Sequence, residues 1–270
     1  MYPEIIRIGN FVISSFGVMM VVAFLTNNYL LRKDMKHFGQ NPDVADEITF
    51  RAAIGGVLGA KIYYLIENIP SGHAMGNLNG LWNIIAGIFS LDGGRISSGL
   101  HNFGAGMVFY GGLIGGLLLV TLYIRKQKLE WLPVADWVAP YLVLGHGIGR
   151  IGCLLVGDDY GVPSSVPWAM AFPQGAPPTT IPVHPTQVYE MIGYFLIFAY
   201  LYRRRLKKSF NGEILFKYFV LAGIVRFFVE FLRTNNRYIL NLSGAQYISI
   251  ILIIIGGYHL WKHFRVKQTV

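Results

Sequence analysis

The chain has 270 residues, enough for one or two domains, and 53% of them are hydrophobic while only 14% are charged. With a mean hydropathy of +0.45, this composition predicts an integral membrane protein, because several apolar stretches approach the ~20 residues that a spanning helix needs. The net charge of +9 does not indicate nucleic-acid binding, since the basic residues gather at the ends of apolar stretches, and one cysteine excludes an internal disulfide or a multi-cysteine metal site.

Seven apolar stretches predict an all-α polytopic membrane protein with seven transmembrane helices. In chain order they cover residues 11–31, 48–66, 103–124, 134–156, 186–202, 214–232 and 246–261. The opening Met-Tyr-Pro-Glu lacks the basic region of a cleavable signal, so the first stretch is expected to remain as a helix. A further apolar stretch at 81–91 is too short to span, and we expect it to lie in the membrane interface.

Lysine and arginine residues predict the orientation of these helices. Fourteen fall at connections on one side, and three fall on the other side. Because cytoplasmic loops carry an excess of basic residues, the N-terminus is predicted outside and the C-terminus in the cytoplasm. The fourteen are Arg32, Lys33, Lys36, Arg125, Lys126, Lys128, Arg203, Arg204, Arg205, Lys207, Lys208, Lys262, Arg265 and Lys267, and the three are Arg7, Arg95 and Arg237.

Two long connections are predicted on the outer side, at about 68–102 and 157–185. The first is rich in Gly, Ser and Asn, and the second contains seven prolines. Loops of this length usually carry function or are disordered. The sequence shows neither an internal repeat nor a domain linker, so residues 1–270 predict a single transmembrane domain.

Charged residues inside the predicted spans are the strongest indication of function. Arg226, Glu230 and Arg233 are spaced to share one helical face, and Arg150 lies within an earlier span. Such charges are costly in a bilayer and mark a functional site or a paired structural ion. Because cations outnumber anions here, we expect an anionic ligand, with a phospholipid head group as the obvious candidate. The alternative is an ion pair within the helix, with Arg233 extending to the outer surface.

Glycine-rich sequences surround some of these charges, at 107–116 and at 145–161. Small residues let a helix or a lipid approach the backbone, although ordinary helix packing has the same signature. Arg150 lies in the middle of the second sequence and favours a ligand, because packing does not need an arginine. Asp158 and Asp159 follow where this helix leaves the membrane, and they either pair with Arg150 or are solvated. Glu190 is a further ionisable residue near the start of a span.

Five short sequences resemble those of the phosphatidylglycerol–prolipoprotein diacylglyceryl transferase family in their order and spacing, and the resemblance covers nearly the whole chain. They are Phe-Tyr-Gly-Gly-Leu-Ile-Gly at 109–115, Gly-Arg-Ile-Gly at 149–152, His-Pro-Thr-Gln-Val-Tyr-Glu at 184–190, Arg-Phe-Phe-Val-Glu-Phe-Leu-Arg at 226–233 and Gln-Tyr-Ile-Ser at 246–249. The resemblance implies a multi-pass enzyme of the bacterial cytoplasmic membrane. It would transfer a diacylglyceryl group from phosphatidylglycerol to the cysteine thiol of a prolipoprotein signal peptide. Its partners would be these substrates and membrane lipids, without a cofactor, a metal or nucleic acid.

The resemblance also implies roles for individual residues. Negative charge builds on the leaving glycerol phosphate, so arginines are expected to stabilise it. The expected catalytic residues are Arg150, Arg226, Tyr110 and Asp158. Arg150 and Arg226 are also expected to bind substrate, together with Glu230, Arg233, Gly111, Gly112, Cys153 and Gly161.

Several positions depart from the pattern of the family. Tyr110 stands where the family has a histidine, and Cys153 stands where it has an asparagine. Asp158 replaces a glutamate, while Phe16 and Ala222 replace tyrosines. The phosphate-binding arginines are kept, so these changes bear on the reaction more than on the fold.

The changes leave the base that takes the thiol proton open. Tyrosine has an unperturbed pKa of ~10, so Tyr110 is a weak base, and His184 and His146 are alternatives. Cys153 is either a small packing residue or a thiolate that carries the diacylglyceryl group between substrates. A second hypothesis is a paralogue that binds a phospholipid or another lipid-linked anion without this transfer. A transporter is disfavoured, because no inverted repeat is found.

Overall fold

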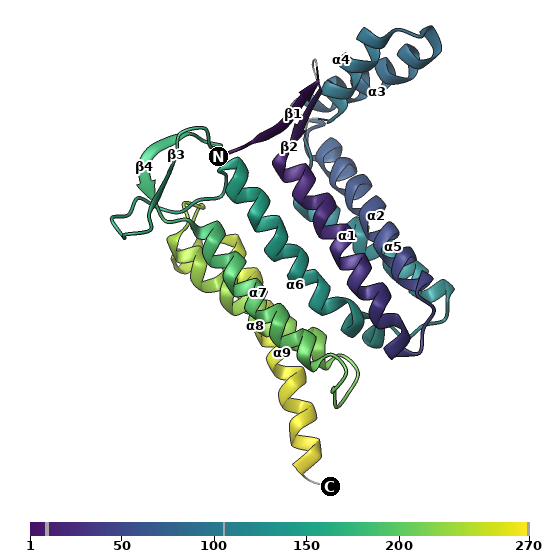
Figure 1. The fold of residues 1–270 in the computed structure, drawn as a ribbon, viewed down its shortest axis with the longest axis vertical. Helices are drawn as coiled ribbons and strands as arrows, with labels where there is room; N and C mark the ends of the chain where they lie inside the picture. Colours follow the sequence, from purple (N-terminus) through teal and green to yellow (C-terminus); the bar gives the residue numbers. More distant parts are fainter. Residues whose placement is uncertain (9–10, 105, 269–270) are drawn as a thin grey trace. The chain divides into compact units, whose positions relative to one another are not determined.

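The computed structural model describes residues 1–8, 11–104 and 106–268, and these are mostly helical (Figure 1). The helices are α1 (Ser15–Met35), α2 (Asp43–Glu67), α3 (His73–Ser90), α4 (Gly93–Gly104), α5 (Phe109–Lys126), α6 (Trp131–Val156), α7 (Thr186–Arg204), α8 (Glu213–Val229) and α9 (Gly244–Gln268). Short 3-10 helices are η1 (Lys36–Phe38), η2 (Glu230–Leu232) and η3 (Ile239–Asn241). Strands β1 (Glu4–Ile8) and β2 (Phe11–Ser14) form one two-stranded sheet, and β3 (Met170–Phe172) and β4 (Thr179–Val183) form another.

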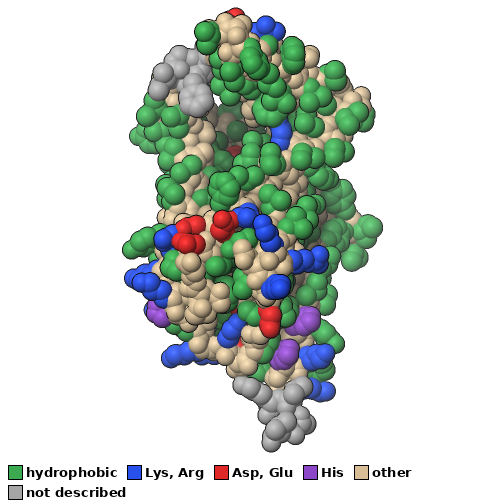
Figure 2. Space-filling model, turned by 90° about the vertical axis from the view of Figure 1, so that its right-hand side faces the viewer, with side chains coloured by type: hydrophobic (Ala, Val, Ile, Leu, Met, Phe, Trp, Pro, Cys, Tyr) green, Lys and Arg blue, Asp and Glu red, His purple; other side chains and the backbone are tan. Residues whose placement is uncertain are grey.

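Some of the helices have the length and composition of membrane spans. Within the described residues, α5, α6 and the Gly244–Arg265 part of α9 are long and apolar enough to cross a bilayer. Hydrophobic side chains also cover much of the face drawn in Figure 2. On α5, four large apolar side chains within two turns are exposed, namely Leu113, Ile114, Leu117 and Leu118. Such a surface suits lipid contact better than water.

The chain divides into two compact units that alternate along the sequence. The first contains Met1–Ile6, Ile13–Pro42 and Glu130–Val270, and the second contains Arg7–Val12 and Asp43–Leu129. The sequence does not reveal this division, because the connections around residues 42 and 129 are as short as those within the units.

In the first unit, α6 packs against α1, α7 and α8, and α9 packs against α8. The core between α6, α7 and α8 includes Ala139, Val143, Leu201 and Ile214. Part of α9 extends beyond the other helices of this unit (Figure 1). These contacts place the end of α6, the start of α7 and the end of α8 close together.

The other end of the first unit is held by buried acidic residues. Asp34 of α1 pairs with Arg205 and accepts a hydrogen bond of 2.5 Å from Tyr141 of α6. Asp136 of α6 pairs with Lys208 at 2.9 Å and accepts hydrogen bonds from the first backbone N–H groups of α8. A carboxylate at a helix N-terminus is stabilising, because it satisfies free donors there. Two of the four predicted cytoplasmic groups of basic residues, at 32–36 and 203–208, lie at the helix ends joined here.

The second unit is built on close contact between two glycine-rich helices. A Cβ atom on Gly115 of α5 would lie 2.2 Å from the carbonyl oxygen of Gly55 on α2. A Cβ on Gly111 would lie 2.4 Å from the carbonyl oxygen of Gly59. The glycine-rich sequence at 107–116 therefore has a packing role, which was one of the two interpretations of its composition.

The connection predicted at 68–102 is helical over most of its length, and its apolar stretch belongs to a longer helix. The helix α3 begins after Gly72, at φ +77°, and ends before Leu91, at φ +54°. Its glycines are used for packing: a Cβ on Gly80 would lie 2.7 Å from the backbone nitrogen of Phe103. The Gly, Ser and Asn residues indicated a loop by composition, but here they allow α3 and α4 to touch.

Several predicted spans have different starts in the structure, and the second begins at Asp43 instead of residue 48. The first begins at Ser15 instead of residue 11, because the side chain of Ser14 caps the helix by accepting from the N–H of Gly17 at 3.1 Å. The third is interrupted: α4 ends at Gly104, Gly106 adopts φ +77°, and α5 begins at Phe109.

Candidate active site

Glu190 is the centre of a cluster of charged side chains at the end of the first unit opposite Asp34 and Asp136. It projects from α7 and is fully buried. Its Oε2 lies 2.5 Å from Nε of Arg150 on α6, and its Oε1 lies 2.5 Å from Nη1 of Arg226 on α8. One carboxylate therefore joins two arginines from two other helices.

Glu230, in η2, forms a second ion pair with Arg226. Its Oε2 lies 2.8 Å from Nη2 of Arg226. Its Oε1 accepts hydrogen bonds from Asn235 at 2.6 Å and from the Ser243 hydroxyl at 2.7 Å. The guanidinium of Arg226 is thus fixed on two sides by carboxylates that are themselves held. No pattern in the sequence pointed to Asn235 or Ser243, since both lie in the irregular connection after η2.

Arg233 is buried inside this cluster and does not extend to the outer surface. Its guanidinium pairs with Asp159 and lies 3.9 Å from Glu190 and 3.7 Å from Glu230. The alternative of an ion pair within one helix is therefore only partly correct. The pair between Arg226 and Glu230 exists, but both residues also bind other parts of the chain.

The charges in the cluster are balanced, which corrects the expectation of excess positive charge. Three arginines meet three carboxylates, because Glu190 and Asp159 come from segments distant in sequence. The carboxylates consequently hold the three arginines close together and offset the repulsion between their positive charges. Arg150 and Arg226 keep 18% and 22% of their side chains exposed. Each guanidinium has five N–H donors, so these two can still bind another acceptor.

The turn after α6 brings Asp159 to the arginines. The helix ends at Gly157, at φ +76°, a left-handed conformation that favours glycine. The Oδ2 of Asp159 then lies 2.7 Å from Nη1 of Arg150, and its backbone carbonyl accepts from the Thr186 hydroxyl at 2.7 Å. Burial favours the neutral acid, but Arg233 and Arg150 hold the pKa of Asp159 below its ordinary value. Asp159 therefore stays ionised and paired.

Gly161 is needed for the close approach of this turn to η2. Its N–H donates to the carbonyl of His184 at 2.8 Å, and a Cβ on it would lie 2.4 Å from the carbonyl oxygen of Leu232. Leu232 directly precedes Arg233, so this contact also fixes the position of the Arg233 backbone. This geometry gives Gly161 a positioning role.

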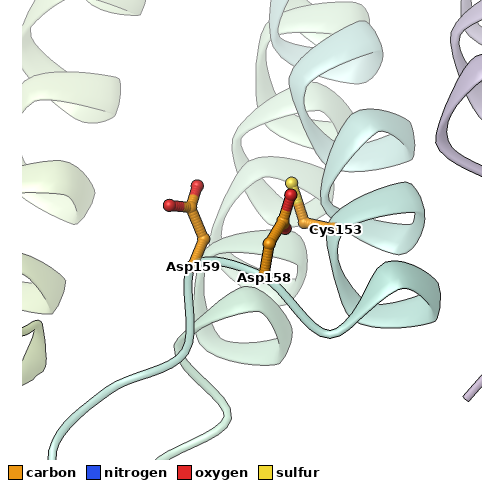
Figure 3. Close-up of side chains that lie close together, drawn as sticks. All are labelled: Cys153, Asp158 and Asp159. Carbon is orange, nitrogen blue, oxygen red and sulfur yellow. The ribbon is translucent and has the colours of Figure 1, made fainter. Parts of the chain in front are cut away.

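Cys153 and the two aspartates lie together at the end of α6 (Figure 3). One ligand atom from each of Cys153, Asp158 and Asp159 lies within 4.8 Å of the others, as in a metal site. However, Nη1 of Arg150 already lies 2.7 Å from Asp159 and 3.5 Å from the sulfur of Cys153. A guanidinium thus supplies the positive charge, and the arrangement needs no metal ion to be balanced.

The side chain of Asp158 points toward the thiol of Cys153 (Figure 3). Its backbone carbonyl accepts from the side chain of Gln187 at 2.5 Å. Burial raises the pKa of Asp158, because it disfavours the charged carboxylate. Its neighbour Asp159 is the carboxylate that pairs with the arginines.

The whole chain can now be compared with known proteins. The family model described as prolipoprotein diacylglyceryl transferase matches residues 3–262. The chain belongs to this family. A phosphatidylglycerol–prolipoprotein diacylglyceryl transferase of Clostridium tetani is 35% identical over 260 residues, which are 95% of each chain. A protein of the same name from Thermotoga maritima is 31% identical over 93% of this chain and 81% of its own.

A third relative, from Clostridium perfringens, is named phosphatidylglycerol–prolipoprotein diacylglyceryl transferase 2. It is 34% identical over 257 residues, covering 94% of this chain and 92% of its own. The resemblance found from five short sequences is therefore confirmed over nearly the full length. As a member of the prolipoprotein diacylglyceryl transferase family, the chain is a polytopic membrane protein and a transferase.

Three predicted site residues of this family member lie in the second unit, at the start of α5. Gly111 is buried against α2, where a Cβ would lie 2.3 Å from Cβ of Tyr63. Gly112 is half-buried beside Gly56 of the same helix. Tyr110 is exposed, with its ring edge-on to Phe109 at 5.9 Å. Helix packing alone explains why residue 111 is a glycine, without any contact to a ligand. A catalytic role for Tyr110 stays a prediction.

Proposed function

We propose that this transferase moves a diacylglyceryl group from phosphatidylglycerol to the cysteine thiol of a prolipoprotein signal peptide, in the bacterial cytoplasmic membrane. The observation that carries the proposal for the site is the pairing of Arg150 and Arg226 on the two oxygens of Glu190. This arrangement holds two partly exposed guanidinium groups side by side in a membrane protein. Planar guanidinium groups suit the oxygens of a phosphate.

The chemistry explains why fixed arginines would matter. The sulfur attacks the glycerol carbon that carries the phosphate, an S–C bond forms, and the C–O bond to the phosphate breaks. The phosphodiester, with one negative charge, becomes a phosphomonoester with up to two. Donors that are already in position stabilise this growing charge without reorganising, and losing one such donor typically costs about 10²–10³-fold in kcat. Glu190 and Glu230 supply the positioning.

We further propose seven spans, namely α1, α2, α5, α6, α7, α8 with η2, and α9, with the C-terminus in the cytoplasm. A spanning helix needs roughly 20 residues, and α1 has 21 while α2 has 25. Support for the orientation comes from the basic residues at the end of the first unit that Asp34 and Asp136 hold together. The arginine cluster then lies toward the outer side of the membrane, within reach of the outer leaflet.

Complementation tests the proposed reaction. The gene should restore diacylglyceryl-modified lipoproteins in a bacterial strain depleted of its own transferase. The same gene with Arg226→Ala should accumulate in the membrane without restoring them. A protein that accumulates, retains phosphatidylglycerol through purification and restores no modification would contradict the transfer reaction.

That last result would favour the second candidate, a paralogue that binds a phospholipid or lipid-linked anion without transfer. The changes at Tyr110 and Cys153 keep this candidate open, because they replace polar residues that the resemblance places near the reacting centre. Purified protein assayed with a lipobox peptide separates the two, since only the transferase converts the peptide.

A further inference from the structure

A second layer of ionisable rings lies one to two helical turns deeper in the first unit than the charged cluster. His146 is four residues before Arg150 on α6, and Tyr194 is four residues after Glu190 on α7. Tyr218 lies two turns before Arg226 on α8. The ring centroid of His146 is 5.5 Å from that of Tyr194 and 6.2 Å from that of Tyr218. The same three helices therefore build both layers.

His146 differs from the other residues of this layer in its exposure. Its side chain is exposed, while Tyr194 is buried and Tyr218 is half-buried. Gly147 and Ile148, which follow it on α6, are buried as well. A histidine inside a membrane helix is costly, and such residues usually line a substrate or proton path.

The ring nitrogens of His146 are also available. Within the part of the chain that the structure describes, its contacts are with the two tyrosine rings, and no hydrogen bond to either nitrogen is found. His184, the other candidate base, has its Nδ1 3.0 Å from the hydroxyl of Tyr189. A structural histidine inside a bundle would be expected to use its nitrogens in this way.

We propose that His146 accepts the proton of the incoming cysteine thiol; this inference rests on the transfer reaction proposed above. Four residues of α-helix correspond to about 6 Å along the axis, so His146 lies one turn before Arg150, whose guanidinium would hold the phosphate. The reacting carbon is attached to that phosphate, and the sulfur must approach it from the opposite side. The spacing of His146 and Arg150 therefore fits a base and a phosphate ligand on either side of one reacting carbon.

The step balances as a single proton transfer. The thiol proton goes to an imidazole nitrogen, and the sulfur electron pair forms the S–C bond. The C–O electron pair leaves with the phosphate. The imidazolium then gives its proton to water or to the released phosphate, which restores the neutral ring. Histidine suits this step, because its unperturbed pKa of ~6.5 leaves it largely neutral at pH 7.

The groups around His146 determine its proton affinity. The charged groups nearest to it along the helices are Arg150, one turn later on its own helix, and Glu190, one turn before Tyr194 on α7. The neutral rings of Tyr194 and Tyr218 lie beside it. On the side of α6 toward α1, the neighbouring Gly145 lies against the amide of Asn27.

A pH–rate profile with purified full-length protein tests this role. Initial rates would be measured between pH 6 and 9.5 with phosphatidylglycerol vesicles and a lipobox peptide that contains one cysteine. His146→Gln should lower the rate about 10²-fold near pH 7. The loss should shrink as the pH passes ~8.5, where the peptide thiol ionises by itself. Binding of phosphatidylglycerol should be unchanged.

His259→Gln is the matched control. His259 also lies in the first unit and stacks on an aromatic ring, with its centroid 4.3 Å from that of Phe216, but it sits on α9 away from the cluster. The transfer rate of this control variant should equal that of the unmodified protein at every pH. A His146→Gln variant with normal rates, or with the same fold loss at every pH, would overturn the proposal.

If His146→Gln does not accumulate, the unmodified protein still decides the question. With His146 as the base, its rate should level off above the pKa of the histidine. A rate that rises tenfold per pH unit up to the pKa of the thiol would show that the base is hydroxide and would overturn the role of His146. Absence of any transfer by the unmodified protein would contradict the proposed function itself, which separates the two failures.

Discussion

At the scale of single residues, Glu190 has an unusual position, because it is fully buried and pairs with two arginines. Glu190→Gln keeps the shape of the side chain but removes the charge between Arg150 and Arg226. Removing one partner of a buried ion pair typically costs about 3–5 kcal/mol. We therefore expect a clearly lower melting temperature in detergent and little accumulation in the membrane.

Asp159→Asn is the control for this change. Asp159 also pairs with Arg150, but 42% of its side chain is exposed, so water can replace much of what is lost. We expect a smaller shift in melting temperature than for Glu190→Gln. Equal shifts for the two variants would contradict the central position given to Glu190.

Cys153 is the second residue for which the structure makes a definite prediction. Its thiol is buried and lies 3.5 Å from Arg150, but a thioether formed there would be a poor leaving group for a second transfer. Packing is the simpler role, since free cysteines are commonly buried and inert. Cys153→Ala and Cys153→Asn should both keep transfer within a few-fold of the unmodified rate.

Labelled phosphatidylglycerol provides the decisive readout for Cys153. Purified protein would be incubated with the lipid and no acceptor peptide, and then digested. Label recovered on the peptide that contains Cys153, together with inactivity of Cys153→Ala, would establish the two-step route and refute the packing role.

At the scale of elements, the contact between α2 and α5 depends on missing side chains. Gly115→Ala places a methyl group 2.2 Å from the backbone oxygen of Gly55, so the helices must move apart. Gly56→Ala, next to Gly55 on α2, is the control. Its new methyl group would lie 3.9 Å from the carbonyl oxygen of Gly112, which is an ordinary van der Waals distance. We expect Gly115→Ala to accumulate poorly and Gly56→Ala to accumulate normally in membrane fractions.

The helices also show how much of this fold can be predicted from its sequence. Most helices of the first unit begin and end within a few residues of the predicted spans, because long apolar stretches and caps are local signals. The exception is α9, which was predicted to end at residue 261 but continues to Gln268. The helices α3 and α4 were not predicted, since Gly80 and Gly99 look like loop residues until the partner helix is known.

The candidate site shows the same limit. Arg150 and Arg226 were identified from the cost of a charge in an apolar stretch, which is a local argument. Asp159 and Glu230 were named as possible partners, but the pairing of Glu190 with both arginines was not predicted. Only the packing of α6, α7 and α8 brings these segments together. The balance of charge in the cluster is therefore a property of the fold.

At the scale of the whole molecule, orientation is the main open prediction. A reporter fused after Val270 should be active only if it works in the cytoplasm, because the basic residues predict that side for the C-terminus. A second fusion, within residues 173–178 between β3 and β4, should report the periplasm. Periplasmic activity at Val270 would contradict the seven-span arrangement.

The most direct measurement of the central claim is the transfer rate of purified Arg226 variants with labelled phosphatidylglycerol and a lipobox peptide. Arg226 contacts Glu190 through Nη1 and Glu230 through Nη2, and lysine cannot reproduce this fork with a single ammonium group. Without Arg226, Glu190 still pairs with Arg150, and Glu230 still accepts from Asn235 and Ser243. We predict that Arg226→Ala and Arg226→Lys both accumulate as folded protein and lose at least about 10²-fold in transfer. Normal transfer by Arg226→Lys would contradict the claim, because it would show that any positive charge at this position is sufficient.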